Sequence, residues 1–287
     1  MSDLVQTRQS LKYPNLFLRR YKGKVFYDNL WHRDPLLLES RGHVTLADGT
    51  LVINPFTKVF NYKENHTSIP NDETVLAVEK INGFMAAVTW VEAVQDVVVS
   101  TSGSLDSNHT TMATSMLSYA IEQLRSLRPS STYIFEICHP SEPHIIQENI
   151  GVYLLGIRST LSTTPYHSTF SDEQLLDVYA RKLRASRPAY MLTTFASAKA
   201  LLPTCTHEGY MVYGQESGKV LKIKSPYYLA LKAMARKQDI LSLDRQRVDE
   251  EFYPLLDHLR ELGTTFSDKP EQERLTYIKY WLQQLGE

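Results

Sequence analysis

The sequence predicts an α+β fold, in which antiparallel β-sheets with flanking helices are followed by a small all-helical domain. Three observations lead to this prediction. Short runs rich in β-branched and aromatic residues, separated by turn signals, dominate residues 24–224. Two segments with helical apolar spacing interrupt these runs, and after Pro226 only amphipathic helical patterns remain. We therefore expect one domain over residues 1–228 and a helical domain over residues 229–287.

Local signals place the individual strands and helices of the β-rich part. Asp48-Gly49 separates two strand-like runs, which predicts a hairpin. Further strands are expected over residues 94–100, 131–138 and 151–158. Apolar residues at helical spacing predict helices over residues 111–125 and 171–186, the second opening at Ser171 with an acidic first turn.

The C-terminal part follows a simpler pattern. Apolar residues recur at helical spacing over residues 227–237, 247–262 and 269–285. Residues 263–268 have the composition of a linker between the last two of these helices.

Composition excludes a membrane-spanning protein. The chain has 287 residues, 43% hydrophobic and 22% charged, and no apolar run approaches the roughly 20 residues that cross a bilayer. The N-terminal residues lack a basic start with an apolar core, and two cysteines are too few for a disulfide framework. We therefore expect a cytoplasmic protein. The net charge of −1 neither indicates nor excludes a nucleic-acid partner, because a local basic face is sufficient.

The segment VEKINGF, residues 78–84, places Lys80 between an apolar run and an Asn-Gly turn. A lysine becomes a good nucleophile only when its pKa, normally about 10.4, falls to about 7 or 8 through burial and nearby cations. Lys222 and Lys224 lie two apart, on one face of an expected strand, and could supply these cations and hold a phosphate. Taken alone, each pattern is more often an exposed hairpin residue or an exposed strand face.

The order of several short motifs favours a catalytic role. They occur in the order found in covalent nucleotidyltransferases, and two upstream segments match the branch typified by phage RNA ligase 1. The chain thus resembles the ATP-dependent RNA ligase family over about residues 27–228. The matching motifs are Arg41-Gly42, Lys58 with Phe60 and Asn61, Lys80-Ile81-Asn82-Gly83, Phe135-Glu136, Glu208-Gly209-Tyr210 and Lys222-Ile223-Lys224-Ser225.

The resemblance implies a catalytic set and its first step. Lys80 would attack the α-phosphate of ATP, giving a lysyl-AMP intermediate and pyrophosphate. Lys222 and Lys224 would hold the α-phosphate throughout. Glu208 would help hold Mg²⁺ or Mn²⁺, and Glu136 would contact either the metal or the ribose hydroxyls.

The same resemblance implies an ATP-binding set around these residues. Arg41 and Lys58 would bind the β- and γ-phosphates. Glu79 would bind the adenine amino group, and Asn82-Gly83 would form a bend that admits the nucleotide. Phe60 would either pack on the base or belong to the core.

The resemblance implies an enzyme that joins RNA 5′-phosphate and 3′-hydroxyl ends through an adenylylated 5′ end. It also implies a role in RNA or tRNA repair and a monomeric protein. Three alternatives stay open: an enzyme whose product is the adenylylated 5′ end, a DNA-end ligase of the same fold, and a non-catalytic module that binds nucleotide or RNA. The C-terminal helices could bind nicked tRNA or brace the catalytic domain. Ser102 stands where the family usually has a basic residue, so contact between its segment and phosphates is an open question.

Overall fold

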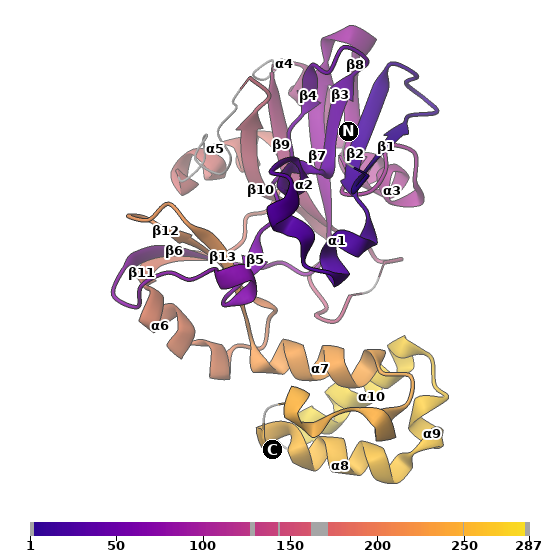
Figure 1. Cartoon of the computed structure of the whole chain (residues 1–287), viewed down its shortest axis with the longest axis vertical. Coiled ribbons are helices and arrows are strands. Elements are labelled where there is room, and N and C mark those ends of the chain that lie inside the picture. Colours follow the sequence, from indigo (N-terminus) through magenta and orange to yellow (C-terminus); the bar gives the residue numbers. More distant parts are fainter. Residues whose placement is uncertain (1–2, 127–129, 143, 162–171, 249, 285–287) are drawn as a thin grey trace.

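The strands form three sheets, of which two lie together at the top of the molecule and the third lies below them; a group of helices lies at the bottom (Figure 1). The computed structural model describes residues 3–126, 130–142, 144–161, 172–248 and 250–284. Within these residues no helix combines the length and apolar character needed to cross a membrane.

Two of the sheets have four strands, and all their pairings are antiparallel. The first follows the chain order, with β1 (Val5–Gln9), β2 (Leu16–Tyr21), β3 (Arg41–Leu46) and β4 (Leu51–Ile53). The second has the order β10 (Gly151–Ser159), β9 (Ser131–Cys138), β7 (Phe84–Val91) and β8 (Asp96–Thr101). The expected hairpin at Asp48-Gly49 and the three expected strands are confirmed.

The third sheet has five strands and carries most of the predicted site. Its order is β11 (Tyr190–Thr194), β6 (Thr74–Glu79), β12 (Gly209–Gly214), β13 (Val220–Lys224) and β5 (Phe60–Asn61). All pairings are antiparallel except that of β13 with β5. The α+β fold class with mostly antiparallel sheets is therefore confirmed.

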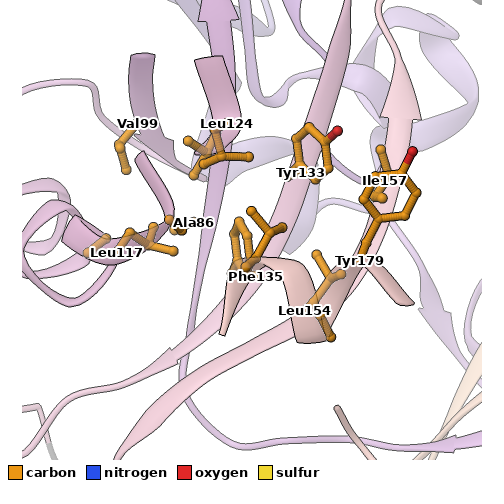
Figure 2. Packing of buried hydrophobic residues seen from close by; sticks show 14 of the residues in the cluster. Ala86, Val99, Leu117, Leu124, Tyr133, Phe135, Leu154, Ile157 and Tyr179 are labelled. Carbon is orange, nitrogen blue, oxygen red and sulfur yellow. The ribbon is translucent and has the colours of Figure 1, made fainter. Parts of the chain in front are cut away.

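Helices cover one face of the second sheet and form a large core there. Figure 2 shows Phe135 and Leu154 of this sheet pointing into a cluster that Leu117, Leu124 and Tyr179 complete from the helical side. The covering helices are α3 (Asn108–Met116), α4 (Ser118–Ser126) and α5 (Glu173–Leu183). Burying such large side chains contributes about 1.5–3 kcal/mol each relative to exposure.

The prediction of one helix over residues 111–125 was wrong, because Leu117 separates α3 from α4. The Thr114 hydroxyl donates to the Thr110 carbonyl, a bond that bends helices. For α5, Asp172 is the N-cap and accepts from the Leu175 N–H. Ser171, expected at this start, lies outside the described residues. The short helices α1 (Gly23–Tyr27), α2 (Leu36–Glu39) and α6 (Phe195–Ala200) were not predicted, since four to six residues show no helical period.

The helices after residue 225, here called the helical region, are α7 (Pro226–Arg236), α8 (Tyr253–Leu262), α9 (Thr264–Ser267) and α10 (Glu271–Gln284). The helix expected over residues 247–262 begins only at Tyr253, because 3₁₀ turns precede it and Pro254 favours the first helical turn. Residues 263–268 are not a plain linker, since α9 lies within them. The domain boundary at residue 228 stays a prediction.

The core of the helical region includes two residues from the β-rich part. Ile145 and Ile146, in the β9–β10 connection, are only 3% and 9% exposed and pack with the buried leucines of α7 and α8. The two parts of the chain are thus joined by packed side chains as well as by the β13–α7 connection.

Candidate functional site

Lys80 lies where the chain leaves the third sheet and enters the second. β6 ends at Glu79 and β7 begins at Phe84, and the two strands belong to different sheets. The Asn-Gly pair is therefore not a hairpin turn, and the alternative interpretation of Lys80 as an exposed hairpin residue is wrong. The Lys80 N–H donates to the Gly209 carbonyl at 2.9 Å, and its side chain is 23% exposed.

Gly83 allows this crossover to lie directly against β9. A Cβ atom at Gly83 would be 2.4 Å from the Ile137 carbonyl oxygen, so a side chain there would displace the backbone. The Gly83 N–H donates to Glu136 Oε1 at 3.1 Å. The close approach seen here is between two strands of the protein, and the approach of a nucleotide to Gly83 stays a prediction.

Glu208 accepts from three donors at once, although it is only 2% exposed. Its Oε2 accepts from Lys80 Nζ at 2.9 Å and from Asn82 Nδ2 at 2.6 Å, and its Oε1 lies 3.1 Å from Lys224 Nζ. Burial alone would raise the pKa of Glu208, but the two ammonium groups outweigh it and the pKa is lowered. Three of the four residues predicted as catalytic are therefore in direct contact.

The fourth, Lys222, shares a face of β13 with Lys224, as predicted. Leu221 and Ile223, which alternate with the lysines, are buried on the other face. This alternation follows from the two-residue period of a strand and fixes both ammonium groups on the side of Glu208.

Five cations converge at this site. Burial and the positive charges of Lys58, Arg41, Lys224 and Lys80 together lower the pKa of Lys222 to about 7. Arg41 belongs to the first sheet and the two lysines of β13 to the third, whereas Lys58 precedes β5 and Lys80 follows β6. Repulsion between so many positive charges raises the free energy of the folded protein unless an anion binds among them. Such a cluster is typical of a site for a highly charged phosphate ligand.

Lys58 and Phe60 lie together beside the first sheet. Lys58 Nζ is 5.0 Å from the centre of the Phe60 ring and 3.4 Å from Glu64 Oε1. The Phe60 ring packs edge to face on Trp31 at 5.6 Å, within a small core cluster. The structure therefore gives Phe60 a core role, and its contact with a nucleobase stays a prediction.

Glu79 and Glu136 are the remaining acidic residues of the predicted site. Glu79 Oε1 is 3.8 Å from His207 Nδ1, and its side chain is partly exposed, so it is open to a ligand. Burial raises the pKa of Glu136, while the nearby Lys80 ammonium partly opposes this. The charge of Glu208 raises the pKa of Glu136 as well, which shows that the two carboxylates act on one another.

The segment containing Ser102 packs against the Arg41-Gly42 motif. Gly42 has φ +93°, and a Cβ atom there would be 2.6 Å from the Thr101 carbonyl oxygen. Arg20 is paired with Arg41 in the β2–β3 ladder, and its Nη1 lies 3.8 Å from the Cβ position of Gly103. The cation next to this segment is thus Arg20 of β2. The sequence shows it as part of a basic run, but not its position beside Ser102.

Sequence interpretation also missed Lys232 on α7. Burial lowers the pKa of Lys232, and the charges of Lys224 and Arg236 lower it further. Lys224 Nζ lies 4.7 Å from the centre of the Tyr228 ring. The sequence contains a pattern that places Lys232 near the site. Residues 228, 232 and 236 are spaced four apart directly after the last lysine motif, so they share a helix face.

The comparisons with known proteins agree with this geometry. A family model described as RNA ligase matches residues 39–237. Two forms of an archaeal ATP-dependent RNA ligase have TM-scores of 0.59 and identities of 15% and 16%; the matches cover 98% and 94% of this chain and 84% and 72% of theirs. A putative ATP-dependent DNA ligase from Aquifex aeolicus has a TM-score of 0.57 at 13% identity, covering 96% of this chain and 73% of that one. No curated protein matches the chain closely enough to count as a relative.

The two kinds of match carry different weight. At these identities the solved structures show the fold alone, and they confirm the expected nucleotidyltransferase fold of ATP-dependent ligases. The family match covers more than half of the chain and includes the motifs from Arg41 to Lys224. The chain belongs to the RNA ligase family.

Proposed function

We propose that this protein is an ATP-dependent RNA ligase that joins 5′-phosphate and 3′-hydroxyl ends through a lysyl-AMP intermediate on Lys80. The observation that carries the proposal is the contact of Lys80 with Glu208 inside a group of four further cations. A nucleophilic amine beside a site for several phosphate groups fits nucleotidyl transfer from a triphosphate.

In the first step, Lys80 Nζ attacks the α-phosphorus of ATP. A nitrogen–phosphorus bond forms, the bond to the bridging oxygen breaks, and pyrophosphate leaves with that electron pair. Nζ must release a proton, and Glu208 Oε2, at 2.9 Å, is positioned to accept it. Arg41 and Lys58 neutralise the charge that develops on the leaving pyrophosphate, while Lys222 and Lys224 hold the α-phosphate.

The second and third steps reuse the same cations. An oxygen of the RNA 5′-phosphate attacks the α-phosphorus and the bond to Lys80 breaks, which gives an adenylylated 5′ end. Because displacement is in line, this oxygen enters opposite Lys80, from the side that pyrophosphate left. The 3′-hydroxyl then attacks the 5′-phosphate, and AMP leaves. We propose broken RNA, such as nicked tRNA, as the substrate of a cytoplasmic monomer.

Glu136 and Glu208 fit a divalent cation that is shared with the phosphates. Within the described residues no group of three or more His, Cys, Asp or Glu side chains could bind a metal alone. Mg²⁺ is usually held by one or two carboxylates together with substrate phosphates, which is the number available here. When bound, Mg²⁺ or Mn²⁺ would neutralise phosphate charge.

The pKa of Lys222 predicts how ATP binding depends on pH. With a pKa of about 7, Lys222 is largely charged at pH 6 and largely neutral at pH 8. Phosphate binding favours the charged form, so above pH 7 ATP must bind together with a proton. We expect the affinity for ATP to be level below pH 7 and to fall by up to about tenfold per pH unit above it.

Titration calorimetry at pH 8, in two buffers with different heats of ionisation, measures this proton uptake. Lys222→Met should remove the difference between the buffers, whereas Lys219→Met, on an exposed turn of the same sheet, should retain it. Equal heats in both buffers for the unmodified protein would show that Lys222 does not take up the proton.

The overall proposal is tested with ATP labelled at the α- or the γ-phosphate. The protein and Mg²⁺ should acquire label from the α-phosphate only, and adding RNA with a 5′-phosphate should move the label to the RNA end before a sealed product appears. Parallel RNA and DNA 3′-hydroxyl ends distinguish RNA from DNA joining. A protein that binds ATP but acquires no label would be the non-catalytic module instead.

A further inference from the structure

We infer that the helical region positions the catalytic lysine through a loop of the β-rich part, and that Asn82 is the positioning residue that connects the two. The loop comprises residues 139–150 between β9 and β10 and is called the tether loop below. This inference rests on the proposed function, because it concerns the reaction of Lys80.

The backbone N–H of Asn82 and both polar atoms of its side chain are engaged by the protein. The N–H donates to Glu148 Oε1 at 2.9 Å, Oδ1 accepts from the Ile146 N–H at 3.0 Å, and Nδ2 donates to Glu208 Oε2 at 2.6 Å. Asn82 is 8% exposed, so water cannot easily replace these bonds. Two of these three bonds are to the tether loop, and the third is to the carboxylate that contacts Lys80; the Tyr228 hydroxyl of α7 also interacts with the Asn82 side chain.

The bond from Ile146 fixes which way the Asn82 amide points. A carboxamide has an acceptor on one side and a donor on the other. With Oδ1 held by the Ile146 N–H, Nδ2 is directed at Glu208. If the bond were lost, the amide could rotate and the Glu208 carboxylate would lose one of its three donors.

The helical region, in turn, fixes the tether loop. Within the described part of residues 139–150 the loop has no helix or strand that could hold it in place. From the β-rich part it is held by the contact of His109 Nε2 with Glu142 Oε1 at 3.2 Å. From the helical region it is held by Ile145 and Ile146, which are buried in one core with Leu231 of α7 and Leu259 of α8. The position of the Ile146 N–H therefore depends on how the helical region packs.

A second connection runs from the helical region to Glu208 and does not include Asn82. The Ser225 N–H donates to the Glu208 carbonyl at 3.1 Å, and Ser225 Oγ donates to the His207 carbonyl at 2.6 Å. These bonds hold the Glu208 backbone, whereas Asn82 holds its carboxylate. Asn82→Ala keeps the backbone bond to Glu148 but removes the acceptor of the Ile146 N–H, so an effect transmitted through the Ile146–Asn82 bond must disappear in this variant.

The test measures the rate of lysyl-AMP formation in single turnovers, together with the Kd for ATP. Asn82→Ala should slow the reaction about 100-fold with an unchanged Kd, since misplacing a reacting group by about 1 Å has effects of this size. Ile146→Ala should slow it about tenfold. The double variant should be no slower than Asn82→Ala, because both substitutions interrupt the same connection.

Leu176→Ala is the matched control, since Leu176 is fully buried in the separate core of the second sheet and makes none of these contacts. It should lower the melting temperature at least as much as Ile146→Ala and leave the rate per folded molecule unchanged. If Ile146→Ala does not fold, Ile146→Val can replace it in the comparison of single and double variants. Its effect on the rate should be smaller, because it removes only one methyl group.

Three results would overturn the inference: multiplying losses in the double variant, a loss in Leu176→Ala equal to that in Ile146→Ala, or a rise in Kd that accounts for the loss in Asn82→Ala. The last would mean that Asn82 contacts the nucleotide. In all three cases the unmodified protein still forms the adduct, so the proposed function stands; a lack of adduct in that protein would overturn both.

Discussion

Replacing Lys80 by alanine is expected to eliminate the covalent AMP adduct while leaving the protein folded. In the proposed reaction the Lys80 side chain supplies the attacking nitrogen. Among the described lysines only Lys224 also contacts Glu208, and it shares a face of β13 with Lys222. Glu208 keeps Lys224 and Asn82 as partners in this variant. We therefore expect a loss of only about 1–2 kcal/mol in the free energy of unfolding.

The adduct is measured by intact-protein mass spectrometry after incubation with ATP and Mg²⁺, and peptide mapping should place AMP on Lys80. Lys80→Arg retains the positive charge without a nucleophilic amine, so it should also fail to react. Lys219→Ala, on the exposed β12–β13 turn, should react normally. Undiminished adduct in Lys80→Ala would show that another residue carries the nucleotide.

Replacing Glu208 is expected to have the largest combined effect on stability and on reaction. In Glu208→Ala, the Lys80 and Lys224 ammonium groups lose their shared carboxylate, and Asn82 Nδ2 loses its acceptor. Leaving buried charges unpaired costs about 3–5 kcal/mol. Lys80 also loses its orientation and its proton acceptor, so we expect adduct formation to slow by about 1,000-fold or more.

The pH dependence of stability distinguishes the charge of Glu208 from its shape. Because its folded-state pKa lies below the ordinary value of 4.5, ionised Glu208 stabilises the protein fully above that value, and the stabilisation is lost as pH falls through the folded pKa. The difference in melting temperature between the unmodified protein and Glu208→Gln should therefore be constant above about pH 4.5. It should decrease towards zero as the pH falls further.

Glu73 provides a matched control at the far end of the same sheet. It is also buried, and it accepts from the Ser217 hydroxyl and N–H in the β12–β13 turn. Glu73→Gln should lower stability without changing the rate of adduct formation. If Glu208→Gln formed the adduct as fast as the unmodified protein, the charge of Glu208 would have no part in the reaction.

Which residues lie together at the site could be predicted from the sequence more fully than the contacts and connections that position them. Lys222 and Lys224 could be placed on one face because a strand repeats every two residues, and motif order placed Lys80 and Glu208 in one site. The crossover of residues 80–83 between two sheets could not be predicted, because an Asn-Gly pair has the same local signal in a hairpin as in a connection.

Contacts between segments far apart in the chain could not be predicted from the sequence either. Ile145 and Ile146 lie in a connection without periodicity, so nothing local shows that they are buried in the helical region. The same holds for Arg20, whose position beside the Ser102 segment depends on the pairing of β2 with β3. In each case the information is in the tertiary packing rather than in propensity.

The distribution of the site over all three sheets has a consequence during synthesis. Lys80 leaves the ribosome well before Glu208 and β13, so a nascent chain contains Lys80 without the carboxylate and the lysines that lie near it in the folded protein. If Lys80 is the nucleophile proposed above, adenylylation has to wait until β13 has paired with β12 and β5. Newly made chains would then consume no ATP before these strands are in place.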